Sequence, residues 1–470
     1  MPPVTVLGCN KLIGMVEMRL SVIEQGCTEI CQGLFIAYIY CYISTHSKQS
    51  MMKVFKFILT GYLSILWLTN VNAQNNSPAT PVSPLTGMLA PLPPMGWNTW
   101  NTFQTKINED MLKEMVDRYV SSGMREAGYR YFVLDDGWMS MERDAAGSLV
   151  ADPVKFPHGM KAFADYVHAK GLKFGIYNCA GSKTCAGYPG TRGHEYEDAR
   201  LYASWGVDFL KYDWCNTDSL NAPEAYKTMS AALRATGRPI VFSICEWGDH
   251  APWLWAGGVG ELYRTTGDIS ASFNVRKPIG NWTPQSVISI LDLQEAIRKY
   301  NGPNHWNDPD MLEVGNGMSN VEDRAHFSLW CMLAAPLAAG NDLRKMSPQT
   351  VEILTNGEMI AIDQDARGIA AFKMVLPDSV ELWVKPLKNN ELALCFFNRT
   401  GSTRNISMNW KDLIITDKFS GTDIHFDKEI FSMRDVWSKK AAGDTKSKME
   451  KQLASHDVIV LRLKPAGGGR

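Results

Sequence analysis

The sequence predicts an α/β protein in which a (β/α)8 TIM barrel is followed by a C-terminal antiparallel β-sandwich domain. Between residues 91 and 370, short apolar runs alternate with amphipathic helical segments, as expected of βα units. From residue 371 to residue 470, strand-like runs follow one another without such helices. That change of rhythm separates the two domains.

Eight apolar runs are predicted to be the strands of the barrel, the number that closes this fold. They cover residues 95–98, 129–135, 173–177, 207–213, 239–245, 262–266, 305–308 and 336–340. One intervening helix is predicted over 111–122, because its apolar residues recur at spacings of three and four. A second is expected to start at a Thr283-Pro284 cap and run to about Tyr300, and a third to cover 322–333.

Almost every predicted strand ends in polar or aromatic functional groups. These are Trp97-Asn98, Asp135-Asp136, Tyr177-Asn178, Asp213, Glu246-Trp247, Asp268, Asp308 with Asp310, and Asn341-Asp342. In a parallel barrel all these strand ends converge on one rim, where active sites lie. A single carboxylate there would mean little, but so many of them indicate a catalytic site.

The C-terminal domain is predicted to be a β-sandwich that carries few catalytic groups. Its expected strands cover residues 380–384, 391–397, 405–410 and 458–463. The polar stretch 434–453 gives no firm secondary-structure pattern.

The residues before the barrel predict an exported protein. Residues 51–73 combine two lysines, a short apolar run and the small side chains of Val71 and Ala73, the pattern of a secretory signal peptide. Since such a peptide begins a chain, residues 1–50 are a doubtful extension, with a genuine anchor as the alternative. Residues 74–90, rich in Asn, Ser, Thr and Pro, are a predicted linker. We therefore expect a secreted or periplasmic protein with no membrane segment in its mature form.

The charge balance argues against a nucleic-acid or membrane-surface partner. The chain has 48 basic and 49 acidic side chains, a formal net charge of −1, and so offers no net field to attract phosphates. Its nine His residues show no ligand spacing, and residues 187–190 are not a phosphate loop. Neither a metal nor a cofactor is expected, and the oligomeric state is left open.

Five motifs occur in unbroken order along the predicted barrel. They are PMGWNTW at 94–100, LDDGW at 134–138, KYD at 211–213, CEW at 245–247 and WNDPDM at 306–311. Together they resemble glycoside hydrolase family 27 of the α-galactosidase (melibiase) type, over roughly residues 91–375. The resemblance implies a retaining exo-glycosidase that removes terminal α-linked D-galactose from oligosaccharides or polysaccharides.

The same resemblance implies that Asp213 is the nucleophile and Asp268 the general acid/base. Retaining glycosidases need two carboxyl groups about 5–5.5 Å apart. Alternation along the strand puts Lys211 on the face of Asp213, where its ammonium would favour the ionised carboxylate. Either aspartate alone could instead cap a helix, and Asp308 and Asp310 compete with Asp268 for its role.

Several further residues are expected to bind the sugar. Asp135 and Asp136 would be costly as buried neighbouring charges unless sugar hydroxyls donate to them; by resemblance, Asp135 would accept from O6 and Asp136 from O4 of galactose. Glu246 would bond the 2-hydroxyl, which favours galactose over N-acetylgalactosamine, and the retained Asp135 disfavours arabinopyranose. Trp97 is expected in the barrel core, an alternative also open for the other tryptophans. The remaining residues implied at the pocket are Trp100, Trp138, Tyr177, Lys211, Trp247, Arg264 and Asp310.

The resemblance also implies a disulfide between Cys185 and Cys215, close to Asp213. Cys245 is left unpaired, because its usual partner position holds Gly260. The bulky Trp214 could alter the space for the leaving group. The alternatives are an α-N-acetylgalactosaminidase, a β-L-arabinopyranosidase or a transglycosylating enzyme on the same scaffold, and a non-catalytic galactose-binding protein.

Overall fold

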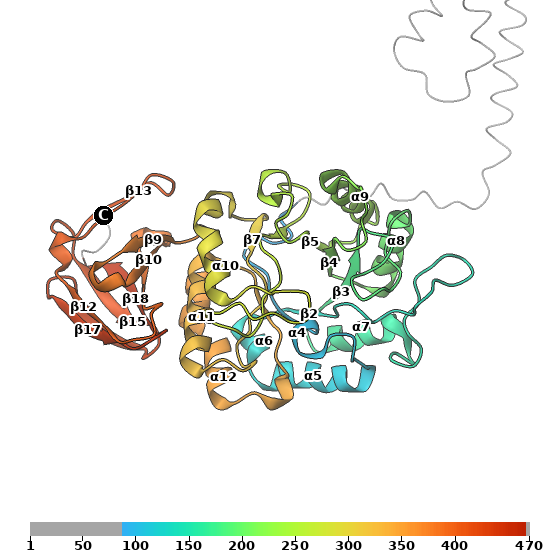
Figure 1. Cartoon of the computed structure of the whole chain (residues 1–470), viewed down its shortest axis with the longest axis horizontal. Coiled ribbons are helices and arrows are strands. Elements are labelled where there is room, and N and C mark those ends of the chain that lie inside the picture. Colours follow the sequence, from blue (N-terminus) through green and yellow to red (C-terminus); the bar gives the residue numbers. More distant parts are fainter. Residues whose placement is uncertain (1–86, 467–470) are drawn as a thin grey trace, which may run out of the picture. The chain divides into compact units, whose positions relative to one another are not determined.

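The computed structural model describes residues 87–466, which contain an eight-stranded parallel sheet followed by antiparallel sheets (Figure 1). The predicted extension 1–50, the signal peptide 51–73 and most of the linker 74–90 lie outside the described residues. No helix within 87–466 combines the length and the apolar character needed to cross a membrane.

The eight parallel strands curl into a barrel in which each strand pairs with its sequence neighbour, and the first also pairs with the last. Seven of the eight predicted runs contain one of these strands, and the remaining run, 173–177, lies within a strand that extends two residues further. The strands are β1 Met95–Asn98, β2 Tyr131–Val133, β3 Lys173–Cys179, β4 Phe209–Asp213, β5 Val241–Cys245, β6 Leu262–Arg264, β7 Trp306–Asp308 and β8 Leu337–Ala339. The predicted fold class is therefore confirmed.

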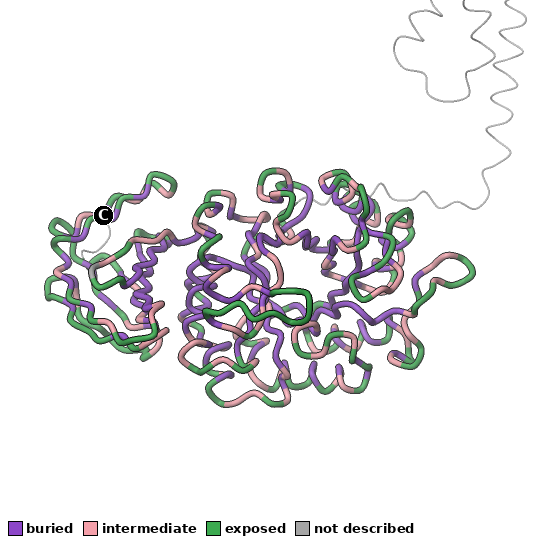
Figure 2. The backbone as a smooth tube through the Cα atoms, in the orientation of Figure 1, coloured by how far each residue is buried: buried purple, intermediate pink, exposed green. Residues whose placement is uncertain are grey.

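Helices surround the curled sheet (Figure 1). They are α4 Trp100–Phe103, α5 Glu109–Ser121, α6 Met124–Ala127, α7 Gly159–Ala169, α8 Glu195–Trp205, α9 Ala222–Ala235, η2 Pro252–Leu254, α10 Val287–Gln294, η3 Glu295–Tyr300, α11 Asn320–Leu333, η4 Leu343–Lys345, α12 Pro348–Leu354 and α13 Gly357–Asp363. The periodic apolar face predicted within α5 is buried. Buried backbone follows the strands and the inner helix faces, while exposed residues gather on loops (Figure 2).

The predicted start of the helix after β6 is wrong. Thr283 and Pro284 lie in the preceding loop, and α10 starts three residues later behind Ser286. The Ser286 side chain accepts from the backbone N–H of Ser289, whose own side chain bonds back to Ser286. This reciprocal cap satisfies two otherwise unpaired N–H groups, which the Thr-Pro pair does not.

The base of the barrel is closed by apolar side chains from the strand starts. Trp306 is fully buried there, and its indole N–H donates to the carbonyl of Ala90. Ala90, the last residue of the predicted linker, is itself buried, and its N–H donates to the side chain of Asn304. The strand starts therefore contribute an apolar cluster, whereas the functional groups lie at the strand ends on the opposite rim.

Residues 372–465 form antiparallel sheets around a second apolar core. The strands are β9 Phe372–Val375, β10 Glu381–Pro386, β11 Leu392–Phe397, β12 Arg404–Met408, β13 Ile414–Asp417, β14 Thr422–His425, β15 Phe431–Asp435, β16 Lys440–Asp444, β17 Met449–Leu453 and β18 Val458–Pro465. All four predicted strands are present. The others were missed, and β16 shows why: none of its residues is buried, so it lacks an apolar pattern.

Candidate active site

The carboxyl ends of seven barrel strands surround a pocket of about 120 Å³. It is lined by Trp100, Asn101, Asp135, Tyr177, Cys185, Lys211, Asp213, Cys215, Trp247, Arg264, Asp268, Asp310 and Met311. The side chains at the strand ends therefore converge as the sequence predicts. Asn101 and Met311 were not predicted, although each lies beside or inside one of the motifs.

Asp213, the predicted nucleophile, ends β4 and is 6% exposed. Its Oδ1 accepts a hydrogen bond from the backbone N–H of Trp214 at 2.9 Å. Burial raises the pKa of Asp213 to about 7; Lys211 acts in the lowering direction, and the charge of Asp268 raises the pKa further. The expectation that Lys211 keeps this carboxylate ionised is thus incomplete, because burial outweighs the ammonium.

Lys211 makes its direct contact with Asp135. Its Nζ lies 2.8 Å from Asp135 Oδ2, which also accepts from the side-chain amide of Asn98. The other carboxylate oxygen, Oδ1, accepts from the backbone N–H of Asp136. Asp135 and Lys211 are 2% and 15% exposed at the side chain, so this pair forms a fixed, polar floor.

Asp268, the predicted acid/base, lies at the more open side of the pocket, with 41% of its side chain exposed. Arg264 Nη2 contacts Asp268 Oδ1 at 3.0 Å and Asp310 Oδ2 at 2.8 Å. Arg264 itself is 3% exposed. One buried guanidinium therefore holds both carboxylates.

Asp310 has little hydrogen-bonding capacity left for a substrate. Its Oδ2 also accepts from the backbone N–H of Ile269, and its Oδ1 from that of Met311. Burial raises the pKa of Asp310 to about 6, against the lowering effect of Arg264. Since Ile269 follows Asp268 directly, Asp310 also anchors the loop that carries Asp268.

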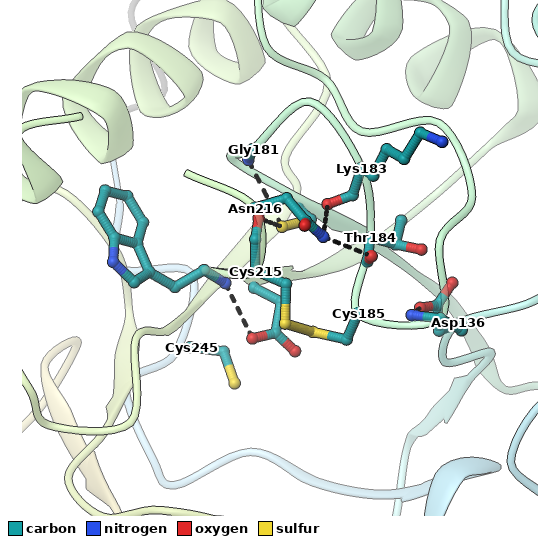
Figure 3. Close-up of a disulfide and its surroundings, with 12 residues drawn as sticks. Asp136, Gly181, Lys183, Thr184, Cys185, Cys215, Asn216 and Cys245 are labelled. Atoms are coloured by element: carbon teal, nitrogen blue, oxygen red, sulfur yellow. Dashed lines mark hydrogen bonds between the residues drawn. A yellow bond between two sulfur atoms is a disulfide. The ribbon is translucent and has the colours of Figure 1, made fainter. Parts of the chain in front are cut away.

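The predicted disulfide between Cys185 and Cys215 is present and lines the pocket (Figure 3). It joins the loops after β3 and β4, with Cys215 two residues beyond Asp213. Asn216 strengthens the connection, because its side-chain amide donates to the carbonyl of Lys183. A Cβ on Gly181 would lie 2.0 Å from the carbonyl oxygen of Cys215, so only glycine allows this approach.

Trp247 reaches the pocket through a strained turn. It adopts a φ of +59°, which is unusual for a bulky residue, and its side chain lines the pocket. The next residue, Gly248, has a φ of +84°, and a Cβ there would lie 2.3 Å from the carbonyl oxygen of Thr265. The turn therefore packs closely on the end of β6, beside the Arg264 cluster.

Asp136, which is expected to bind O4, is not among the residues that line this pocket. Its side chain is fully buried, with Oδ1 accepting from Gly137 N–H and Oδ2 from Ala186 N–H. Burial raises its pKa to about 6. Each oxygen of this carboxylate thus accepts one backbone N–H, and the bond from Ala186 ties the end of β2 to the disulfide loop.

Trp138 and Glu246 were also expected at the pocket and are fully buried elsewhere. The Trp138 indole donates to the carbonyl of Tyr177 and packs edge-on against Trp205, so it belongs to the core. Glu246 Oε2 accepts from the backbone N–H of His250 and lies 2.8 Å from its Nδ1. Glu246 Oε1 finds no partner among the described residues, and the neighbouring Trp247 lines the pocket.

The structure also shows where two other tryptophans and a cysteine lie. Trp97 is fully buried, as predicted. Trp214 stacks on Tyr226 within the core and does not line the pocket. Cys245 is a buried free cysteine, as the glycine at position 260 implied.

Next to the pocket wall lies a buried carboxyl group that the sequence did not predict. Glu313 Oε1 accepts from Asn101 Nδ2 at 2.7 Å, and its Oε2 accepts from Asn316 Nδ2. Burial raises the pKa of Glu313 to about 7. Because Asn101 lines the pocket, Glu313 fixes part of the wall without reaching the cavity.

One grouping in residues 87–466 brings potential metal ligands together, and it is Cys185, Asp213 and Cys215. Both sulfurs are joined in the disulfide, so they cannot supply the thiolates that a soft metal site needs.

A barrel whose rim pocket is lined by three buried carboxyl groups and one exposed carboxyl group has the features of a glycoside hydrolase. Comparison with known proteins agrees: the alpha galactosidase A family model matches residues 92–365, and the model of the alpha galactosidase C-terminal beta sandwich domain matches residues 377–463. The chain belongs to the alpha galactosidase A family, and it is a glycoside hydrolase.

Relatives and solved structures cover most of the chain. An alpha-galactosidase A of Cellvibrio japonicus is 52% identical over 359 residues, which are 76% of this chain and 88% of that protein. Alpha-galactosidase I of Mortierella vinacea has a similar structure, with a TM-score of 0.75 at 34% identity, covering 80% and 97% of the two chains. The α-galactosidase of Saccharomyces cerevisiae, crystallised with raffinose, gives a TM-score of 0.71 at 30% identity, covering 80% and 98%.

Proposed function

We propose that this protein hydrolyses terminal α-linked D-galactose from oligosaccharides or polysaccharides with retention of configuration, through Asp213 as nucleophile and Asp268 as general acid/base. The observation that carries the proposal is the pairing of a buried and an exposed aspartate in one pocket. A nucleophile can remain enclosed against the sugar, whereas an acid/base must meet both the leaving group and the incoming water.

The reaction follows from these positions. An ionised Asp213 oxygen attacks the anomeric carbon and forms an ester, while the carboxyl proton of Asp268 passes to the departing glycosidic oxygen. Asp268, now ionised, takes a proton from a water molecule, whose oxygen attacks the anomeric carbon and releases Asp213. Two inversions give net retention.

Asp268 is favoured over its two competitors by its surroundings. Asp310 already accepts two backbone N–H bonds and contacts Arg264. Asp308 accepts from the backbone N–H of Asp310 and does not line the pocket. Asp268 alone among the three has an exposed side chain beside the cavity.

The floor and wall support galactose as the sugar. Asp135 and Lys211 offer an acceptor and a donor for hydroxyl groups at the buried end, and Trp100 and Trp247 offer apolar surface for the ring. The bulk of Trp247, which lines the pocket, argues against an N-acetyl group on the sugar. Relatives bearing the name α-galactosidase, and the yeast enzyme crystallised with the galactoside raffinose, support the same assignment.

The decisive experiment compares aryl α-galactoside, aryl α-N-acetylgalactosaminide and aryl β-L-arabinopyranoside at equal enzyme concentration, with NMR detection of the first-formed anomer. We expect the α-galactoside to be cleaved fastest and to give α-galactose first. Faster cleavage of either other glycoside would reassign the substrate. Binding of galactose without cleavage of any of the three would mean a sugar-binding protein.

We also infer that the protein is exported through residues 51–73, because of their lysine, apolar and small-residue pattern. N-terminal sequencing of the protein recovered outside the cytoplasm is expected to begin at Gln74. A first residue within 1–50 would contradict this.

A further inference from the structure

The loop between β6 and α10 exposes an unusual amount of apolar surface. Residues 274–283 are all exposed, and within them Val275 and Ile279 are each 60% exposed and Trp282 is 48% exposed. Three large apolar side chains in so short an exposed stretch indicate a binding surface, since soluble proteins rarely group them without a partner.

This loop is fixed by its own hydrogen bonds. Ile279 and Trp282 exchange two backbone bonds across a tight turn. The Arg276 guanidinium donates from Nε to the carbonyl of Pro284 and from Nη2 to that of Thr283. The indole of Trp282 is therefore presented from a braced hairpin, so little conformational entropy is lost when a ligand packs on it.

The loop begins at the predicted acid/base. The backbone N–H of Gln285 donates to the carbonyl of Asp268 at 2.8 Å, and Ser270 N–H donates back to Gln285 carbonyl at 3.0 Å. Trp282 is three residues from Gln285, so its backbone lies within about 10 Å of that bond. The loop that carries Trp282 is thus hydrogen-bonded to the backbone of Asp268.

The side of Asp268 is the side on which the leaving group departs. A general acid protonates the glycosidic oxygen, so the sugar units beyond that oxygen must extend past the acid. The opposite, buried end is closed by Asp135, Lys211 and Asp213. A saccharide attached to the terminal galactose therefore has to leave the pocket past Asp268, whose backbone is bonded to Gln285 just after the 274–283 loop.

We propose that Trp282, flanked by Ile279 and Val275, is a leaving-group subsite that binds the C–H face of a pyranose ring when the leaving group is two or more sugar units long. This subsite sets the preference for oligosaccharide over small aryl substrates. This rests on the proposed function. Flat indole surfaces suit the apolar faces of sugars, and the side chains of Arg276 and Asn281 in the same loop can meet the hydroxyl groups.

The test measures kcat/KM of wild type and Trp282→Ala on nitrophenyl α-galactoside and on a β-1,4-manno-oligosaccharide that carries one α-1,6-galactose. We expect the oligosaccharide value to fall about tenfold, from the loss of one stacking contact, while the aryl value stays within about twofold. Trp282→Phe should recover much of the loss. Tyr196→Ala, an exposed aromatic in α8 with 43% exposure, is the matched control and should change neither value.

Three outcomes would overturn the subsite. They are unchanged kcat/KM values on both substrates in Trp282→Ala, an equal loss on both substrates in a variant with wild-type melting temperature, and a concentration-dependent dimer that the substitution abolishes. The second would make the loop a support for Asp268, and the third would make it an interface between copies. If wild type cleaves neither substrate, it is the proposed function that fails.

Discussion

The two ends of the pocket differ in how exposed their carboxylates are and in which cation contacts them. At the floor, Asp213 and Asp135 are nearly inaccessible and share the influence of a single buried cation, Lys211. At the mouth, Asp268 is exposed and one guanidinium, Arg264, contacts it directly. The comparison teaches that, at Asp213, burial changes the pKa more than the nearest opposite charge does.

We expect the largest effects on activity when the carboxylates of Asp213 and Asp268 are removed one at a time. Asp213→Ala should lower kcat on every galactoside by about 10⁴-fold or more, because no covalent intermediate can form. Asp268→Ala should lose about 10²- to 10⁴-fold on substrates with poor leaving groups and far less on dinitrophenyl galactoside, which needs no proton. Steady-state kinetics with added azide checks both: Asp213→Ala should yield β-galactosyl azide, and Asp268→Ala α-galactosyl azide. Equal losses on all substrates in the two variants would contradict the assignment.

A second change removes the cation of the floor. Lys211→Met leaves Asp135 buried without its ion-pair partner, which should destabilise the protein by about 3 kcal/mol or more. Because Lys211 lowers the pKa of Asp213, the acid limb of kcat/KM should also move to higher pH. Denaturant unfolding and a pH profile of the variant measure the two effects. An unmoved limb in a folded variant would show that the ammonium has no influence on the nucleophile.

A smaller effect is expected in the pH dependence of kcat/KM, because it reports the ionisation of Asp213. Asp213 must be ionised to attack, and its pKa is raised to about 7, so kcat/KM should fall as the pH drops through about 7. The charge of Asp268 contributes to that raised pKa. Asp268→Asn, assayed with dinitrophenyl galactoside, should therefore shift the acid limb to lower pH. A shift in the opposite direction would mean that the limb belongs to another group.

The smallest expected effect tests whether burial acts the same way outside the pocket. Asp323 in α11 is 2% exposed; its Oδ2 accepts from Gly315 N–H, and its Oδ1 finds no partner among the described residues. Burial raises its pKa to about 7, above the unfolded value of about 3.9. Its contribution to stability is thus present below pH 4 and lost as the pH rises through 7.

Asp323→Asn should consequently stabilise the protein at pH 8 by about 1–2 kcal/mol, with little difference from wild type at pH 4. Thermal unfolding at the two pH values measures this. Asp165→Asn, an exposed aspartate of α7, is the control and should show no such pH-dependent gain. An Asp323→Asn variant that is less stable than wild type at pH 8 would show that the carboxylate is satisfied by contacts beyond the Gly315 bond.

Elements whose structure is fixed by interactions between residues close in sequence were predicted well, and the others were not. The strand 95–98 was predicted to the residue, since a short apolar run bounded by turn residues carries its own signal. The start of α10 was missed by three residues, because Ser286 and Thr283-Pro284 both fit an N-cap and only the formed bond to Ser289 distinguishes them. Strands β16 and β17 were missed because their side chains are largely exposed and so lack alternation.

The sequence by itself determined the barrel, the sandwich, the family and the convergence of Asp213 with Asp268, because strand ends in a parallel barrel share one rim. Only the tertiary structure decided which member of each adjacent pair meets the cavity: Asp135 and not Asp136, Trp247 and not Glu246. It also decided that burial outweighs Lys211 at Asp213. The direction of a side chain and its desolvation depend on neighbours from distant strands, so a single run of residues does not predict them.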